Sequence, residues 1–226
     1  MAILYSAIRG STQIYKVDTD AATVERAFTA GIGAMGLAFG LSQDLFVFSG
    51  SAVQSYNIDT GSRLTSFYTP GIPQTWGLAV DHNGDVWPGG YGEQHKYSAS
   101  GVKQFEFSLS GDTDPRAWTL GDNFCIGVGY YIYQYLPTSP YTRSLLMQLP
   151  ISIHDGGFDF DSRDETVWAV KNYGKSYYQI SIATGAILKV VTPTPIGGLS
   201  SNPNVSYLAH RDRFSVAGQR LNTCHM

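Results

Sequence analysis

Side chains that could carry acid–base chemistry are few in this sequence. The five histidines are at positions 82, 95, 154, 210 and 225, and only His154, followed by Asp155, comes just before an expected apolar strand that begins at Gly157. A histidine beside a carboxylate can act as an acid–base pair, but the side chains of adjacent residues usually point apart. We therefore predict that His154 and Asp155 are ordinary loop residues and that the protein has no catalytic residues.

Oxygen ligands for a metal ion are also scarce. The short strands that begin near residues 36, 77, 117 and 157 contribute Leu37, Leu78, Trp118 and Phe158, with Asp159 as their one carboxylate. One carboxylate cannot supply the six to eight oxygen ligands that Ca²⁺ takes, so Asp159 is expected to bond to nearby backbone or water. The glycine patterns at 89–92 and 127–129 open no expected helix and are not read as phosphate-binding loops. We predict no metal and no cofactor.

Aromatic residues are the more prominent candidates for binding. The chain has 15 Tyr, 11 Phe and 4 Trp, and Tyr91, Tyr131 and Tyr173 are 40 and 42 residues apart. Exposed Tyr and Trp side chains suit protein docking or sugar stacking, and packing inside the fold is the alternative. The residues predicted to share one binding face are Trp76, Tyr91, Arg116, Tyr130, Tyr131, His154 and Tyr173.

An internal repeat of about 41 residues would position these side chains. A small residue opens an apolar strand at Gly36, Gly77, Ala117, Gly157 and Gly198, with spacings of 41, 40, 40 and 41. A second apolar strand is marked by Leu4, Leu45, Val86, Ile126, Val167 and Leu208, and a third strand by Tyr15, Tyr56, Tyr97, Tyr135 and Tyr178. Three markers that keep one period indicate a repeat protein.

Each repeat is predicted to form four short strands. Residues 77–109 contain GLAV, DVWPGG, EQHKYS and VKQFEF, separated by turns such as DHNG and ASG whose residues tolerate positive φ. The second strand is apolar at consecutive positions, as in 45–48 and 167–170, so both of its faces should be covered. Four-stranded sheets stacked radially cover both faces. The pattern predicts an all-β chain that forms a single β-propeller over residues 1–226.

The number of blades follows less directly, because 226 residues contain about 5.5 repeats. We favour six blades, because the segment 205–219 keeps the register of the repeat. The corresponding units are 1–31, 32–71, 72–111, 112–150, 151–193 and 194–226. The alternative is five blades, in which Gly198–Ser201 completes the N-terminal blade and 205–219 forms a C-terminal hairpin. Incomplete terminal blades would leave strand edges that another subunit could cover.

Residues 77–101, GLAVDHNGDVWPGGYGEQHKYSASG, resemble the unit of NHL-type β-propellers and of the related streptogramin-lyase-like and gluconolactonase-like propellers. Residues 36–48 and 156–170 show the same pattern more weakly. The resemblance implies a propeller fold. Gluconolactonase-like propellers hold a metal with Glu, Asn and Asp from several blades, and streptogramin lyases use a His and a Glu with magnesium. This chain offers only Asp159 and His154 at comparable places, so neither activity is carried over.

Composition excludes several classes of function. The 15 basic and 18 acidic residues give a net charge of −3, whereas a nucleic-acid binder would show a basic stripe. No apolar stretch approaches the roughly 20 residues of a membrane helix, and the N-terminus does not read as a secretion signal. We expect a protein that is cytoplasmic at synthesis and is then built into a virion.

The function predicted from these features is that of a non-catalytic propeller that docks to other protein subunits of a larger assembly. The concrete expectation is a bacteriophage virion component, such as a tail, adaptor or decoration protein. A carbohydrate-binding, lectin-like propeller with a glycan partner is one alternative, based on the repeated tyrosines. A metal-dependent lyase or lactonase is the second alternative.

Overall fold

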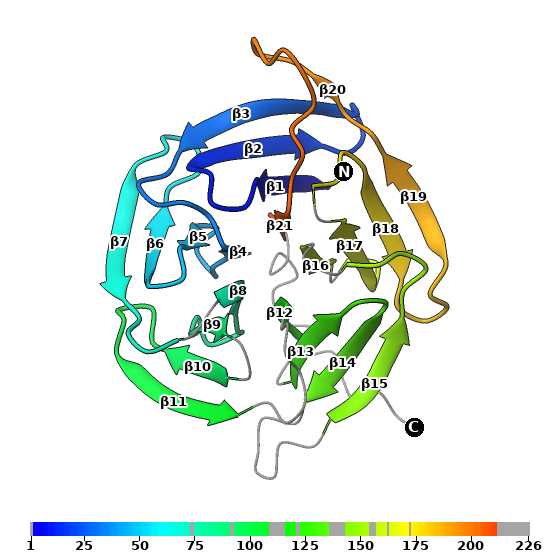
Figure 1. Ribbon diagram of the computed structural model, residues 1–226. Coiled ribbons are helices and arrows are strands. Elements are labelled where there is room, and N and C mark those ends of the chain that lie inside the picture. Colours follow the sequence, from blue (N-terminus) through cyan, green and yellow to red (C-terminus); the bar gives the residue numbers. More distant parts are fainter. Residues whose placement is uncertain are drawn as a thin grey trace.

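The protein is an all-β ring of sheets (Figure 1). The computed structural model describes residues 2–72, 75–90, 93–108, 116–120, 123–135, 143–153, 157–161, 163–171 and 173–211, with backbone alone at 75–76, 90, 93, 107–108, 116–120 and 123–128. Five sheets surround a central axis, and their inner strands lie side by side in the order β21, β4, β8, β12 and β16, after which β16 returns to β21. Within the described ranges, no helix could cross a membrane.

Four of the sheets are regular blades, each built from four consecutive antiparallel strands. Their strands, from the axis outward, are β4 (Gly36–Phe39), β5 (Leu45–Phe48), β6 (Ala52–Tyr56) and β7 (Arg63–Tyr68); β8 (Thr75–Val80), β9 (Val86–Gly90), β10 (Glu93–Tyr97) and β11 (Lys103–Ser108); β12 (Arg116–Leu120), β13 (Asn123–Val128), β14 (Tyr131–Tyr135) and β15 (Arg143–Gln148); β16 (Phe158–Asp161), β17 (Thr166–Val170), β18 (Tyr177–Ser181) and β19 (Ile187–Val191).

The remaining sheet, which we call the composite sheet, joins both ends of the described chain. Its order is β20 (Thr194–Pro195), β3 (Thr23–Thr29), β2 (Gln13–Asp18), β1 (Ile3–Ala7) and β21 (Tyr207–His210). The innermost strand β21 pairs antiparallel with β1, with Leu4 opposite His210. At the outer edge β20 pairs parallel with β3, through Thr194 N–H to Ala22 C=O at 2.7 Å and Ile196 N–H to Val24 C=O at 2.8 Å. The ring is therefore closed by contacts between residues about 200 positions apart.

Both predicted blade counts, six and five, are wrong: the structure has four regular four-stranded blades and the composite sheet. Units 1–31 and 194–226 do not form two blades, because both contribute to the composite sheet. The closing segment proposed for five blades, Gly198–Ser201, is not a strand, since Gly197 and Gly198 lie in a turn with φ of +64° and +85°. The chain first adds β20 to the outer edge of the composite sheet and only then returns to the axis. The inner strand β21 therefore begins only at Tyr207. The rest of the predicted hairpin, 212–219, lies outside the described residues.

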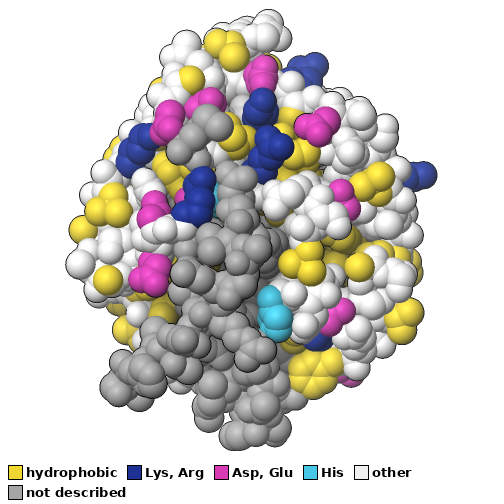
Figure 2. All heavy atoms as spheres, turned by 180° about the vertical axis from the view of Figure 1, so that it is seen from behind, with side chains coloured by type: hydrophobic (Ala, Val, Ile, Leu, Met, Phe, Trp, Pro, Cys, Tyr) yellow, Lys and Arg dark blue, Asp and Glu magenta, His cyan; other side chains and the backbone are white. Residues whose placement is uncertain are grey.

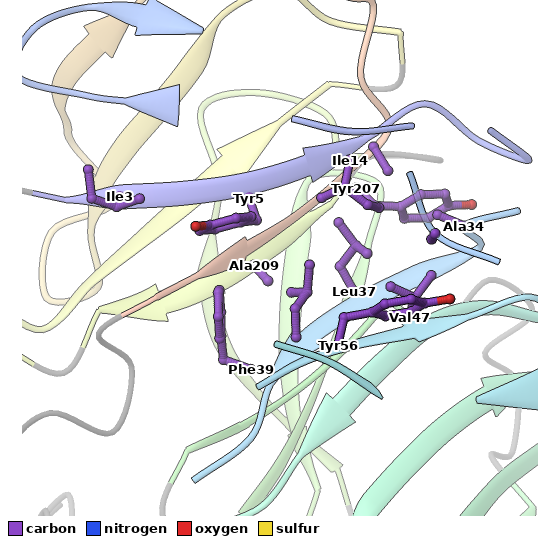
Figure 3. Close-up of a cluster of buried hydrophobic side chains, with 13 residues drawn as sticks. Ile3, Tyr5, Ile14, Ala34, Leu37, Phe39, Val47, Tyr56, Tyr207 and Ala209 are labelled. Atoms are coloured by element: carbon purple, nitrogen blue, oxygen red, sulfur yellow. The ribbon is translucent and has the colours of Figure 1, made fainter. Parts of the chain in front are cut away.

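The two-sided apolar character predicted for the second strands is confirmed in β5 and β17. In β5, Leu45 and Val47 pack in one buried cluster, whereas Phe46 and Phe48 pack in another. Alternate residues of a strand point to opposite faces, so β5 joins the cores on its two sides. In β17 likewise, Val167 and Ala169 lie in one cluster and Trp168 and Val170 in another. Figure 3 shows one such core, between the composite sheet and β4–β5, where the rings of Tyr5 and Phe39 meet edge to face at 5.3 Å. The buried side chains of the described ranges thus form separate cores between neighbouring sheets.

The small residues that mark the repeat lie where inner strands approach one another. A Cβ at Gly36 would lie 2.8 Å from the backbone of Gly77, and a Cβ at Gly157 would lie 2.6 Å from the backbone nitrogen of Leu208 on β21. The predicted landmark Gly198 is an exception, and the buried Ser206 stands before the true inner strand instead. Backbone crowding around the axis thus accounts for the glycines at two landmarks of the repeat.

Replacing Gly157 with Ala is expected to destabilise the ring. The added methyl group would press on the backbone of Tyr207 and Leu208, and overpacking of this kind costs about 1–3 kcal/mol. The free energy of unfolding from urea titration is the measurement. Gly31→Ala is the control, because the three atoms nearest to its Cβ belong to the side chains of Gln54 and Tyr56 and not to backbone. Equal stability of the Gly157→Ala variant and the unchanged protein would contradict this explanation.

Candidate functional site

The predicted binding face lies only partly within the described structure. Tyr91 and His154 lie outside the described residues, and Trp76 and Arg116 lie on β8 and β12 with their side chains not described. Tyr130, Tyr131 and Tyr173 are exposed, with 50%, 39% and 54% of their surface accessible. Tyr131 is the first residue of β14 and Tyr173 precedes β18, so both lie where the second strand of a blade connects to the third, in two neighbouring blades. Their accessibility is what binding requires, and binding itself stays a prediction.

A buried polar cluster lies where β21 closes the ring against β16. Asp159 is 3% exposed, and its carboxylate accepts the backbone N–H of His210 at 2.8 Å and that of Phe160 at 2.8 Å. The prediction that Asp159 bonds to nearby backbone is confirmed. This carboxylate fixes the end of β21 to the neighbouring sheet.

Asp161 extends the cluster toward solvent. Arg163 donates to its carboxylate from Nε at 2.8 Å and from a terminal nitrogen at 2.6 Å, and His210 Nε2 lies 3.3 Å from the same group. Burial would raise the pKa of Asp161, but the hydrogen bonds from Arg163 and the charge of His210 outweigh it and hold the pKa below its ordinary value. The group is therefore an ionised, hydrogen-bonded anchor and not a proton donor.

A related arrangement occurs in the β8–β11 blade, where Asp81 occupies the place in the repeat that Asp161 occupies in the β16–β19 blade. The Asp81 carboxylate accepts the indole N–H of Trp87 at 2.9 Å and pairs with Lys96 at 3.2 Å. Burial would lower the pKa of Lys96, but Asp85 and Asp81 outweigh it and raise that pKa. These carboxylates tie a turn to neighbouring strands.

Sequence reasoning did not select Asp161, Arg163 or His210. The repeat contained one usable signal, because Asp81 and Asp161 stand four residues after Gly77 and Gly157, the residues that mark the first strands of their units. The partner His210 could not be found this way, because its strand is displaced from the period. Within the described ranges, no group of three or more His, Cys, Asp or Glu is arranged to hold a metal ion.

Exposed apolar side chains gather on outer strands. On β19, Ile187, Leu188 and Val190 are 41%, 59% and 54% exposed. On β15 Leu145 is 55% exposed, and on β7 Tyr68 is 66% exposed. Among the described residues, no strand pairs with the outer edge of β19. Of the outer strands with described side chains, β19 is thus the most apolar.

Charges on the surface are mixed. The face in Figure 2 shows basic and acidic side chains beside one another, with hydrophobic ones scattered between them. Ion pairs such as Lys189–Asp20 at 2.7 Å and Lys16–Glu25 at 3.4 Å also join the two signs at the surface. In Figure 2 the described part of this face carries no large field of one sign.

Comparison with known proteins supports the fold and does not identify a family. No protein-family model matches the chain, and no curated protein sequence matches it. Among solved structures, one from the crystal structure of the nidogen/laminin complex superimposes with a TM-score of 0.64 at 13% identity, covering 94% of this chain and 99% of that one. The Myxococcus xanthus glutaminyl cyclase superimposes with a TM-score of 0.56 at 12% identity, covering 84% of this chain and 74% of that one. At such identities the likeness concerns the fold alone, and with the ring of sheets it establishes that the chain has a β-propeller fold.

Proposed function

We propose that the protein is a non-catalytic docking component that binds another subunit of a protein assembly along β19. The observation that carries this proposal is the row of exposed apolar residues Ile187, Leu188 and Val190 on an outer strand. An edge strand offers backbone donors and acceptors to an added strand, and its side chains select the partner.

The expected occupant is an extended segment of a partner subunit with apolar side chains. The protein itself provides the precedent, because Thr194–Pro195 adds as a short strand to the outer edge of β3. Apolar side chains on the partner would cover Leu188 and Val190 and remove them from water, at about 25 cal/mol per Å² of apolar surface. We further propose that the assembly is a bacteriophage virion, as expected from a sequence with few charged and many aromatic residues.

Site-specific photo-cross-linking in the cells that make the protein tests the proposal. A photoreactive amino acid at position 188 is expected to form cross-links to one defined segment of a partner subunit, identified by mass spectrometry. Val190→Lys should abolish the cross-link, because it places a charge in the apolar contact. The matched control carries the photoreactive residue at Val102, which is 64% exposed beside β11.

The cross-linking result distinguishes a partner subunit on β19, a second copy of this chain on β19, and no docking there. A cross-linked apolar segment from position 188 and none from position 102 supports docking on β19. A cross-link from 188 to the same chain would replace the proposed partner with a second copy. Equal cross-linking from both positions, or none from 188, overturns the proposal.

A further inference from the structure

The turn between β8 and β9 contains the one Asn-Gly step of the sequence, Asn83–Gly84. Asn83 is exposed to solvent. Asparagine is a thermolabile residue, because the backbone nitrogen of the following residue can attack its side-chain amide. Glycine favours this attack most, since it has no Cβ to crowd the nitrogen and its backbone is conformationally permissive. The chain therefore places its most reactive asparagine where water reaches it.

Two other asparagines of the described chain lack this combination. Asn204 is also exposed, but Val205 follows it, and a β-branched side chain is stiff and crowds its own backbone nitrogen. Asn202 is followed by Pro203, whose nitrogen carries no hydrogen and cannot form the same cyclic product. Asn204 thus serves as a matched comparison for Asn83, equal in exposure and different in the residue that follows.

In the folded turn the attacking nitrogen is already engaged. Gly84 N–H donates to the backbone carbonyl of Asp81 at 3.0 Å, and Gly84 has a φ of +84°. Oδ1 of the Asp81 carboxylate accepts the backbone N–H of Asn83 at 2.9 Å and that of Asp85 at 3.0 Å. Hydrogen bonds to a charged group are stronger than those between neutral groups. The turn must therefore open before Asn83 can react.

Asp81 is in turn fixed to its blade. It is 6% exposed, and Oδ2 of its carboxylate accepts the indole N–H of Trp87 at 2.9 Å and lies 3.2 Å from Lys96 Nζ. The acceptor that holds the turn is thus held by two further side chains. Local opening of the turn requires breaking hydrogen bonds to an acceptor that cannot follow the moving backbone.

We propose that Asn83 is a site of spontaneous deamidation and that Asp81 sets the rate by holding the turn closed. The Gly84 nitrogen loses its proton to solvent and bonds to Cγ of Asn83. The Cγ–Nδ2 bond then breaks, and the amide nitrogen takes up a proton and leaves as ammonia. Water adds to either carbonyl of the cyclic imide and opens it, which leaves aspartate or isoaspartate at position 83. Water is the co-reactant, and nothing is oxidised or reduced.

Both products alter the turn. Each adds a carboxylate near Asp81 and Asp85, which both pair with Lys96. Isoaspartate also inserts a methylene group into the backbone, so the N–H groups of residues 84 and 85 no longer match their acceptors. The turn is expected to loosen as the protein ages. It belongs to a different blade from β19, and the reaction does not depend on docking there.

Peptide mass spectrometry of the full chain, stored in mildly alkaline buffer made with oxygen-18 water, tests the proposal. Position 83 is expected to exchange its amide for a carboxyl group that carries one heavy oxygen, as two separable isomers. Asn204 should keep its amide, and Asn83→Gln should remove the reaction at position 83. Asp81→Ala is expected to convert at Asn83 about tenfold faster, equivalent to about 1.4 kcal/mol less for opening the turn.

Two further variants separate the role of Asp81 in the turn from general destabilisation. Asp161→Ala removes the carboxylate at the same place of another blade and should leave the rate at Asn83 unchanged. Asp81→Asn keeps an oxygen acceptor for the two N–H groups and should convert at an intermediate rate. The proposal is overturned if Asn83 keeps its amide in both the unchanged and the Asp81→Ala proteins, if their rates are equal, or if Asp161→Ala accelerates the reaction as much.

Discussion

A chain that ends at Asn204 is expected to lose cooperative folding. The truncation removes β21, and with it the pairing to β1 and the contributions of Tyr207, Leu208 and Ala209 to two buried clusters. Burying a large apolar side chain is worth about 1.5–3 kcal/mol, and the ring would also expose the edge of β1. Such a loss approaches the 5–15 kcal/mol that separates folded from unfolded domains.

Circular dichroism during heating, together with dye binding to exposed apolar surface, is the measurement. The unchanged chain should melt in one transition, and the truncated chain should show a broad one with strong dye binding. Adding a synthetic peptide of residues 205–226 should restore part of the cooperative transition, because the open edge of β1 remains available. A truncated chain that melts like the unchanged one would mean that β21 does not close the ring.

Asp161→Ala is expected to cost about 3 kcal/mol of unfolding free energy at neutral pH, because it leaves His210 and Arg163 without their shared carboxylate. The pKa of Asp161 is lowered in the folded protein, so its stabilising effect is present above its ordinary pKa. The effect is lost as the pH falls through the folded value, below about 4. The stability difference between the two proteins should therefore be largest near pH 7 and shrink in acid.

Denaturant titrations of both proteins from neutral pH to about pH 3 measure this difference. Asp20→Ala is the control, since Asp20 forms an exposed pair with Lys189 and such pairs contribute little. A difference that grows in acid would show that Asp161 acts as a buried acid and not as an ionised anchor.

The regular blades were predictable because their signals are local. Apolar runs such as 45–48 occupy two cores at once. The glycines of the predicted turns DHNG and ASG, at 84 and 101, have φ of +84° and +88°. Each signal depends on residues a few positions apart. The sequence therefore predicted the radial stacking of four-stranded sheets from a pattern that any one blade carries.

Ring closure could not be predicted in the same way. The expected inner strand at Gly198 kept the period of 41, but a period records spacing and not which edge of a sheet a strand joins. The polar cluster joins Asp161 to His210 across 49 positions and two sheets.

The composite sheet has a consequence for synthesis on the ribosome. Strands β1–β3 leave the ribosome first, but their inner partner β21 follows about 180 residues later. At roughly 5–20 residues per second, the nascent N-terminal strands wait on the order of ten seconds or more for that partner. The intervening blades can stack on one another as they emerge, because each is local in sequence. We expect the first strands of this protein to be the last to reach their final pairing, and a chaperone that shields strand edges to act there.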